Sequence, residues 1–148
     1  MAFIENRNNQ IRKMKLDNNF NKLVFAKTIF KVVGENQNIE LLKAVANVVM
    51  NRFLYEYEID DEMTFVKCIT NVDLFPCWKN LKSMDEIDLQ NCFFKKCFSL
   101  ALKMLNGKVE DNTLSSIKFK KVSECPVWAV GLKYVKAIDD YLFYNNCD

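Results

Sequence analysis

The segment that most constrains the fold of this chain is "IELLKAVANVVMNRFLYEY", which covers residues 39–57. Its apolar side chains recur at helical spacing, and together they cover most of the helix surface: Leu41, Leu42, Ala44, Val45, Ala46, Val48 and Val49. A helix at the surface of a domain keeps a polar face, whereas a helix that is apolar on most sides is buried. The sequence therefore predicts that residues 39–57 form the central helix of the fold.

Other segments predict helices that would surround this one. Residues 21–33 have helical spacing and are followed by Gly34, a residue typical of a helix C-terminus. Residues 63–70 predict a short helix, and Pro76 makes residues 73–80 irregular. Ser83 and Glu86 have the spacing of a capping box, which predicts a helix over residues 87–107 that ends at Gly107.

The pattern changes after Gly107. Residues 113–122 and 137–145 alternate in the way of short strands, with the loop "SECPVWAVGL" between them. We therefore expect a mainly α fold of the α+β class, with a small antiparallel β element near the C-terminus. Residues 1–20 are polar and rich in Asn, which predicts a loosely held arm, and residues 21–148 are expected to form one domain.

Charge argues against nucleic acid as a partner. The formal net charge of the 148 residues is only +2, and the basic residues are scattered along the chain. The N-terminal residues lack the apolar stretch of a secretory signal, and no apolar run reaches the length of a membrane span. A cytoplasmic location is the default expectation, with export by another route left open.

The six cysteines are spread through the sequence without a CxxC pair, and the chain contains no histidine. A zinc site would need four thiolates from scattered positions, and a Cys–His nucleophilic pair is excluded. This usage favours free, mostly buried thiols in a reducing compartment, although the even count leaves disulfides open for an exported protein. No metal and no cofactor is expected.

Several short segments, taken in order, resemble motifs of the SleB/CwlJ cell-wall hydrolase family. "AKTIF" is similar to the family's AR-x-I-Y, "KAVANVVMNR" to its "VAAVVLNR" helix, and "LFPCWKN" to its "QFSCWN" loop. Further along, "LNGKVEDNT" resembles "LNGTVPDPT", "CPVWA" resembles "PPYWA", and "AIDDYLFY" resembles "RIGNHVFY". The resemblance covers roughly residues 23–144 and implies a lysozyme-like fold that acts on the glycan strands of peptidoglycan.

The resemblance also implies that the catalytic acid is missing. The family's glutamate lies three positions after the Ile of AR-x-I-Y-x-E, and this chain has Val32 there. In the family, that glutamate protonates the glycosidic oxygen and then acts as a base while the sugar closes an anhydro ring. Valine can neither donate nor accept a proton, and general acid catalysis is worth about 10²–10⁴-fold in rate. We therefore expect weak or absent cleavage.

A second motif departs from the family as well. The family's "DPTGGATHYH" stands here as "DNTLSSIKFK", so that the two glycines become Leu114 and Ser115. The two histidines become Lys118 and Lys120. A pair of glycines permits positive φ or a close approach of the backbone to a ligand. A leucine in that position is expected to fill space that a sugar ring would otherwise use.

Candidate site residues follow from the residues and from the resemblance. Glu35 lies one helical turn beyond Val32 and is the candidate for a displaced acid, with a solvated loop residue as the alternative. Trp78, Asp111, Phe119 and Trp128 are the candidates for glycan binding. For the two tryptophans the alternative is burial in the core, because large aromatic side chains are more often packed than exposed to a ligand.

Three functional hypotheses remain open at the level of sequence. The first is a divergent, weakly active or inactive hydrolase relative that binds peptidoglycan, another glycan or a protein partner. The second is an active peptidoglycan lytic transglycosylase or muramidase that uses Glu35, which would then lie in the cleft. The third is a protein-interaction domain unrelated to glycans, which predicts a closed groove and an exposed apolar patch elsewhere.

Overall fold

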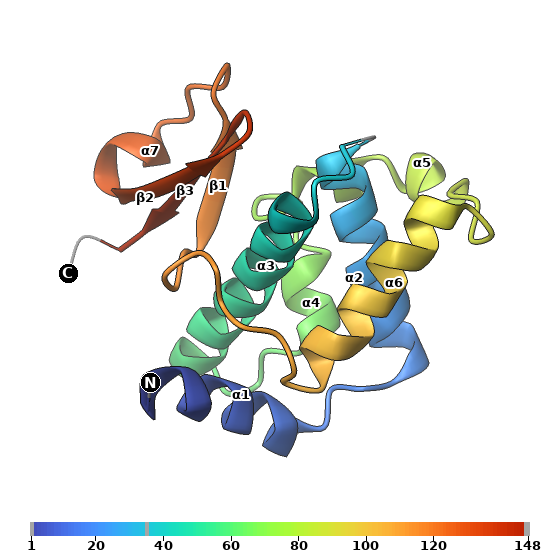
Figure 1. Ribbon diagram of the computed structural model, residues 1–148, viewed down its shortest axis with the longest axis horizontal. Coiled ribbons are helices and arrows are strands. Elements are labelled where there is room, and N and C mark those ends of the chain that lie inside the picture. Colours follow the sequence, from blue (N-terminus) through green and yellow to red (C-terminus); the bar gives the residue numbers. More distant parts are fainter. Residues whose placement is uncertain (1, 35, 147–148) are drawn as a thin grey trace.

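The computed structural model describes residues 2–34 and 36–146 and confirms a mainly α fold with a small antiparallel sheet (Figure 1). The helices are α1 (Ala2–Met14), α2 (Asn19–Val33), α3 (Ile39–Ile59), α4 (Phe65–Ile69), the 3₁₀ helix η1 (Pro76–Lys79), α5 (Leu81–Asp85), α6 (Cys92–Leu105) and α7 (Trp128–Gly131). The strands are β1 (Lys118–Lys121), β2 (Lys133–Ile138) and β3 (Tyr141–Asn145). The sheet lies to one side of the helical body (Figure 1).

Helix α3 is the central helix, as its sequence predicts. Its side chains are buried on most sides, from Leu41 to Phe53, and α2, α4 and α6 lie around it (Figure 1). The Asn38 side chain accepts a hydrogen bond from the backbone N–H of Glu40, which satisfies one of the free donors of the first turn. The apolar surface of α3 therefore fixes the position of the elements packed around it.

Helices α2 and α6 pack against each other through aromatic side chains. The Phe30 ring lies 5.6 Å from the ring of Phe93 and 5.7 Å from that of Phe94, measured between centroids. The expected capping box is wrong, because Ser83 lies inside α5. The side chain of Asn91 instead accepts from the backbone N–H groups of Phe93 and Phe94 and starts α6. Because the Asn91 side chain satisfies two free N–H donors, α6 begins at Cys92 and not at the expected residue 87.

The expected loose arm is also wrong, because residues 2–14 form helix α1 against the body. Ile11 is fully buried, and the guanidinium of Arg7 donates 2.9 Å hydrogen bonds to the side chains of Asn47 and Asn51 on α3. The same guanidinium donates to the backbone oxygen of Val109 at 2.9 Å. The polar composition of residues 1–20 predicted exposure to solvent. The Arg7 side chain instead donates its hydrogen bonds to polar groups of the helical body.

The sheet has the strand order β1–β3–β2, and both pairings are antiparallel. The segment 137–145 is not one strand: a turn at Asp139 and Asp140 divides it into the end of β2 and the whole of β3. Asp139 has φ +53°, a conformation that Asp tolerates better than most residues. Phe143 on β3 is fully buried and joins the sheet to the helical core.

Candidate functional site

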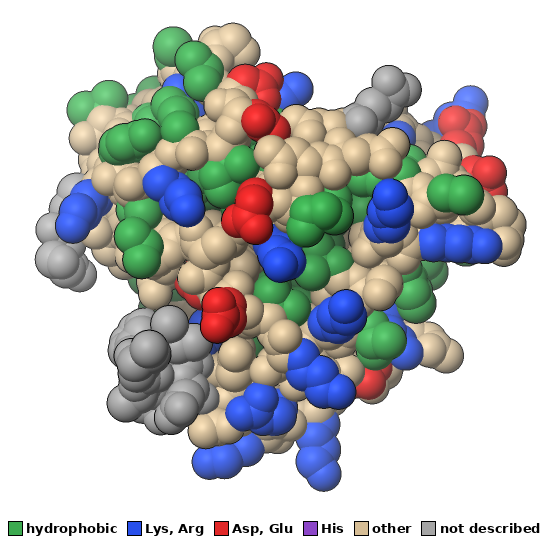
Figure 2. Space-filling view, in the orientation of Figure 1, with side chains coloured by type: hydrophobic (Ala, Val, Ile, Leu, Met, Phe, Trp, Pro, Cys, Tyr) green, Lys and Arg blue, Asp and Glu red, His purple; other side chains and the backbone are tan. Residues whose placement is uncertain are grey.

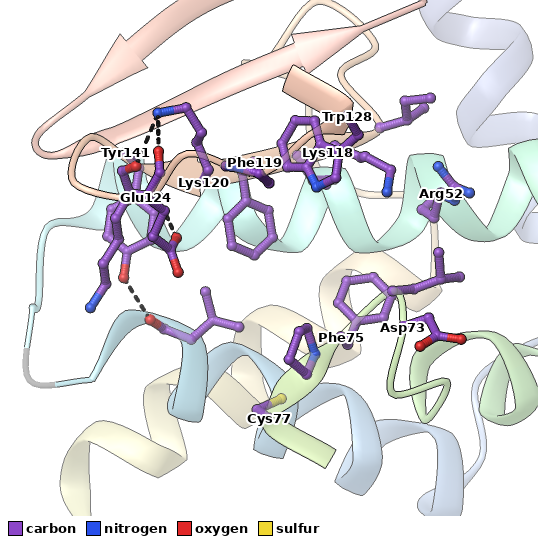
Figure 3. Close-up of a pocket in the computed structure, with 17 residues that line it drawn as sticks. Arg52, Asp73, Phe75, Cys77, Lys118, Phe119, Lys120, Glu124, Trp128 and Tyr141 are labelled. Carbon is purple, nitrogen blue, oxygen red and sulfur yellow. Dashed lines mark hydrogen bonds between the residues drawn. The ribbon is translucent and has the colours of Figure 1, made fainter. Parts of the chain in front are cut away.

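A cleft of about 380 Å³ lies between the helical body and the sheet (Figure 3). One wall comes from α2, α3, the loop before η1 and the first two residues of η1. The other comes from β1, the loop after it, Trp128 at the start of α7 and Tyr141 on β3. Its lining residues are Val32, Val48, Arg52, Asp73, Leu74, Phe75, Pro76, Cys77, Ile117, Lys118, Phe119, Lys120, Lys121, Glu124, Pro126, Trp128 and Tyr141. Phe75 and Phe119 occupy the middle of the view, with charged side chains toward both ends (Figure 3).

The turn of the β2–β3 hairpin is tied to the loop between α2 and α3. The carboxylate of Asp139 accepts 3.0 Å hydrogen bonds from the side-chain amides of Asn36 and Asn38. These two hydrogen bonds, Asn36 first, lower the pKa of Asp139 below its usual value. Further along β2, the ammonium of Lys136 donates to the backbone oxygen of Asn112 at 3.0 Å. The sheet wall of the cleft is therefore held to the body at several points.

Val32 lies in the wall of this cleft, at the end of α2. The resemblance predicts a catalytic carboxylate at this position, and the cleft has an aliphatic side chain there instead. Glu35, the candidate for a displaced acid, lies outside the described residues, so its role stays a prediction. The described carboxylates that line the cleft are those of Asp73 and Glu124, neither of which the sequence motifs singled out.

Trp128 and Phe119 line the cleft, as expected for residues that contact a ligand. Trp78 does not: it is 8% exposed, and its indole N–H donates to the hydroxyl of Thr28 at 2.9 Å. The alternative of a core tryptophan therefore describes Trp78. Its neighbour Cys77 does line the cleft, but burial raises the pKa of its thiol to about 11. That thiol is not a nucleophile at neutral pH.

Asp111 organises a loop and does not line the cleft. Its carboxylate accepts hydrogen bonds from the backbone N–H groups of Thr113 and Ser115, at 2.8 and 3.0 Å. It also accepts from the side-chain amide of Asn51 at 2.9 Å and lies 3.6 Å from the guanidinium of Arg7. These contacts fix the approach to β1, so Asp111 shapes the cleft wall through the backbone instead of touching a ligand.

Leu114 and Ser115 adopt the conformation that their alignment with two glycines implies. Their φ angles are +52° and +66°, both in the left-handed region. The Leu114 side chain is 72% exposed and does not line the cleft. The expectation that it fills space for a sugar ring is therefore wrong, because the left-handed backbone turns this side chain toward solvent.

More cations than carboxylates line the cleft, and the contacts that these cations make differ from one to the next. Arg52 binds Glu56 on its own helix, with nitrogen–oxygen distances of 2.6 and 2.9 Å to one carboxylate oxygen. Lys120 donates to the backbone oxygen of Glu124 at 2.8 Å. Lys118 lies over the ring of Trp128, 5.0 Å from its centroid. The contact between Lys118 on β1 and Trp128 on α7 joins two separate elements, so the spacing of residues along the sequence does not predict it.

A second hollow lies between α3 and α6, on the face that Figure 2 shows. Four lysines and two glutamates line it: Lys43, Lys96, Lys103, Lys108, Glu40 and Glu110. Its described lining contains no aromatic side chain and shares no residue with the cleft. Because ligand pockets are lined mainly by apolar and aromatic side chains with a few polar groups, the cleft is the better candidate for a functional site.

Within residues 2–34 and 36–146, no group of three His, Cys, Asp or Glu side chains is placed to hold a metal ion. No helix in this part of the chain combines the length and the apolar character needed to cross a membrane. Of the cysteines there, Cys92 and Cys125 are exposed, whereas burial raises the pKa of Cys68 and Cys97 to about 12.

A scan against protein-family models, a search of curated proteins and a search of solved structures each gave no significant match. The likeness to the cell-wall hydrolases therefore rests on the motif residues alone.

Proposed function

We propose that this chain is a divergent domain of the SleB/CwlJ cell-wall hydrolase type that binds peptidoglycan glycan in its cleft and has little or no cleaving activity. The observation that carries this proposal is the convergence of the motif segments. Val48, Phe75, Trp128 and Tyr141 come from four separate motif segments and line one cavity. A chance set of short matches has no reason to meet at one surface.

The conformations of two residues support the same reading. Leu114 and Ser115 have left-handed φ angles at the two positions where the family has glycines. Left-handed backbone is uncommon for residues other than glycine and costs roughly 1–2 kcal/mol per residue. A loop of the family's shape that lost its glycines would have this combination of conformation and sequence.

Weak or absent cleavage follows from the lining of the cleft. A lytic transglycosylase of the family type needs one carboxylic acid at the glycosidic oxygen, and the resemblance assigns that acid to the position of Val32. The cleft keeps apolar and aromatic surface from Phe119, Phe75 and Val48, which suits the face of a sugar ring. Binding without efficient chemistry is the function that this combination favours.

A protein-interaction role unrelated to glycans fits less well. That hypothesis predicts a closed groove, whereas the cleft is open and has a volume of about 380 Å³. It also predicts an exposed apolar patch. Val127 and Val130, which flank Trp128, are more than nine-tenths exposed. Neither valine lines the cleft. Loss of glycan binding in a cleft variant that keeps both valines would therefore separate a glycan-binding role from a protein-binding role.

The test is co-sedimentation of the purified chain with insoluble peptidoglycan, followed by analysis of the soluble fraction for released anhydro-muropeptides. We expect saturable binding without release. Phe119→Leu keeps an apolar side chain in the sheet and removes the ring from the cleft. It should weaken binding about fivefold, or roughly 1 kcal/mol. Phe20→Leu, at an exposed residue outside the cleft lining, is the matched control.

Two results would count against the proposal. Binding that Phe119→Leu leaves unchanged, in a variant that keeps its thermal midpoint, would place the glycan outside the cleft. Efficient release of anhydro-muropeptides that Glu35→Gln abolishes would instead favour the active enzyme.

A further inference from the structure

Lys118 places a cation inside the cleft. It stands on β1, its side chain is partly buried, and it lines the cavity next to Phe119. Within the described part of the chain, no carboxylate forms a salt bridge with its ammonium, although four other cations have such partners. A partly buried charge without a counterion is costly, so this one is a candidate to receive a ligand.

Trp128 holds the Lys118 side chain in place. The ammonium lies over the indole ring, 5.0 Å from its centroid, which is within the range of a cation–π contact. The Tyr144 ring meets the same indole edge-on, with centroids 5.3 Å apart and planes at 84°. Much of the Trp128 surface is therefore already occupied. At this end of the cleft, the group available for contact with a ligand is therefore the ammonium of Lys118 and not the face of the Trp128 ring.

In the described part of the chain, no carboxylate forms a salt bridge with Lys118, although the charge of Glu56 acts on it from a distance. Burial first, and then the nearby positive charge of Arg52, lower the pKa of Lys118, while Glu56 raises it. Glu56 is already bound to Arg52, so it is not free to pair with the lysine. Asp73 also lines the cleft, and Figure 3 shows it on the wall opposite Lys118. The local field therefore favours a negative group close to Lys118.

We propose that Lys118, positioned by Trp128, anchors a carboxylate carried by a sugar, so that the cleft selects an acidic glycan over a neutral one of the same size. This inference rests on the proposed function, because it assigns the ligand class of the same cleft. Phe119 lies next to Lys118 and supplies apolar surface for the sugar ring that carries the acid. In peptidoglycan, the lactyl group of muramic acid carries such a carboxylate wherever no stem peptide is attached to it.

The lysine makes this recognition different from that of the histidine to which it corresponds in the resemblance. A histidine is neutral over much of the physiological pH range, whereas an ordinary lysine is charged throughout it. An ammonium and a carboxylate that meet in a partly desolvated cleft form a charge-assisted hydrogen bond, which is stronger than a neutral one. The replacement therefore suits anchoring of an anion.

The test compares two disaccharides that differ in one group. One is N-acetylglucosaminyl-N-acetylmuramic acid, and the other is the same sugar with its lactyl carboxylate converted to the amide. Isothermal titration at low salt should show the acid binding about tenfold more tightly, which corresponds to about 1.4 kcal/mol. The ratio should shrink as salt is raised, because the contact lies near the surface.

Two variants assign the preference to a residue. Lys118→Met keeps the apolar stem on Trp128 and removes the charge, so the acid should then bind no better than the amide. Lys133→Met is the matched control, since Lys133 is an exposed lysine on β2 that does not line the cleft, and it should not affect the ratio. Thermal unfolding of each variant checks that the fold is intact.

The outcomes separate this inference from the proposed function. Equal binding of both disaccharides by the unaltered chain overturns the anchor and leaves glycan binding standing. An acid preference that survives Lys118→Met also overturns it, because another group then reads the carboxylate. If neither disaccharide binds and peptidoglycan does not retain the chain, both proposals fail.

Discussion

The hydroxyl of Tyr141 donates a 2.7 Å hydrogen bond to the backbone oxygen of Val32 and so joins β3 to the end of α2. The last carbonyls of a helix have no partner within the helix. In α2, the backbone N–H of Gly34 bonds Phe30 and that of Asn36 bonds Val33, which leaves the Val32 carbonyl for the tyrosine. One contact between two cleft-lining residues therefore completes a helix end at the position where the resemblance expects the acid.

Removing this hydroxyl should destabilise the chain. Tyr141→Phe leaves the Val32 carbonyl without its donor, and we expect the free energy of unfolding to fall by about 1–2 kcal/mol. Urea denaturation followed by circular dichroism measures the change. Tyr134→Phe is the control, because Tyr134 is 53% exposed, and it should change stability by less than about 0.5 kcal/mol. Equal effects of the two variants would mean that the Tyr141 contact contributes nothing specific.

On the proposed function, a glutamate at position 32 should give the chain cleaving activity. In Val32→Glu the new carboxyl lies in the cleft wall, where partial burial favours the protonated form that a general acid needs. We expect this variant to release anhydro-muropeptides from peptidoglycan at least about 10²-fold faster than Val32→Gln, its isosteric control. A Val32→Glu variant that folds and binds peptidoglycan but releases nothing would show that this position does not face the scissile bond.

The helical core follows from the sequence more directly than the site does. The apolar spacing of residues 39–57 predicts α3 because burial requires that pattern whatever surrounds it. Helix α1 is not predicted because its contacts are polar: nothing in the spacing of Arg7 shows that Asn47 and Asn51 accept its hydrogen bonds from forty residues away. The hairpin turn at Asp139 is not predicted because its left-handed residue is not a glycine.

The site is only partly predictable for a related reason. The order of the motifs places Phe119 and Trp128 in one region, and both line the cleft. Trp78 and Asp111 belong to equally good motifs but serve the core and a loop, because a motif does not show which way a side chain points. The contact between Lys118 and Trp128 depends on how β1 and α7 pack, which local spacing does not encode.

The left-handed backbone at Leu114 leads to a prediction of increased stability. Leu114→Gly removes a conformational cost of roughly 1–2 kcal/mol, offset in part by the greater freedom of glycine in the unfolded chain. We expect a net gain of about 0.5–1 kcal/mol in urea denaturation. Leu81→Gly, at another exposed leucine that is the first residue of α5, should lose stability instead. A loss in both variants would mean that the Leu114 side chain contributes more than its exposure indicates.

The buried pair of Arg7 and Asp111 should be sensitive to loss of either partner. Their side chains are 10% and 6% exposed, and burial lowers the pKa of Arg7 while Asp111 raises it. Arg7→Met leaves the Asp111 carboxylate without its cation, so the free energy of unfolding should fall by about 3 kcal/mol. Lys13→Met, on the exposed side of α1, should have almost no effect. If the two variants match, α1 is not held by this pair.

The anchored turn at Asp139 should make the fold sensitive to acid. The hydrogen bonds from Asn36 and Asn38 lower the pKa of the folded carboxyl, so the charged form stabilises the folded state above the unfolded pKa of about 4. That contribution is lost as the pH falls through the folded pKa.

Asp139→Asn keeps a residue that tolerates φ +53° and removes the charge. The thermal midpoint of the variant should therefore lie below that of the unaltered chain at pH 7. The two midpoints should converge below about pH 3. Asp140→Asn, one residue further along the same turn, is the control at pH 7 and should change the thermal midpoint little. A gap for Asp139→Asn that persists unchanged in acid would mean that the hydrogen bonds from Asn36 and Asn38 do not depend on the charge of Asp139.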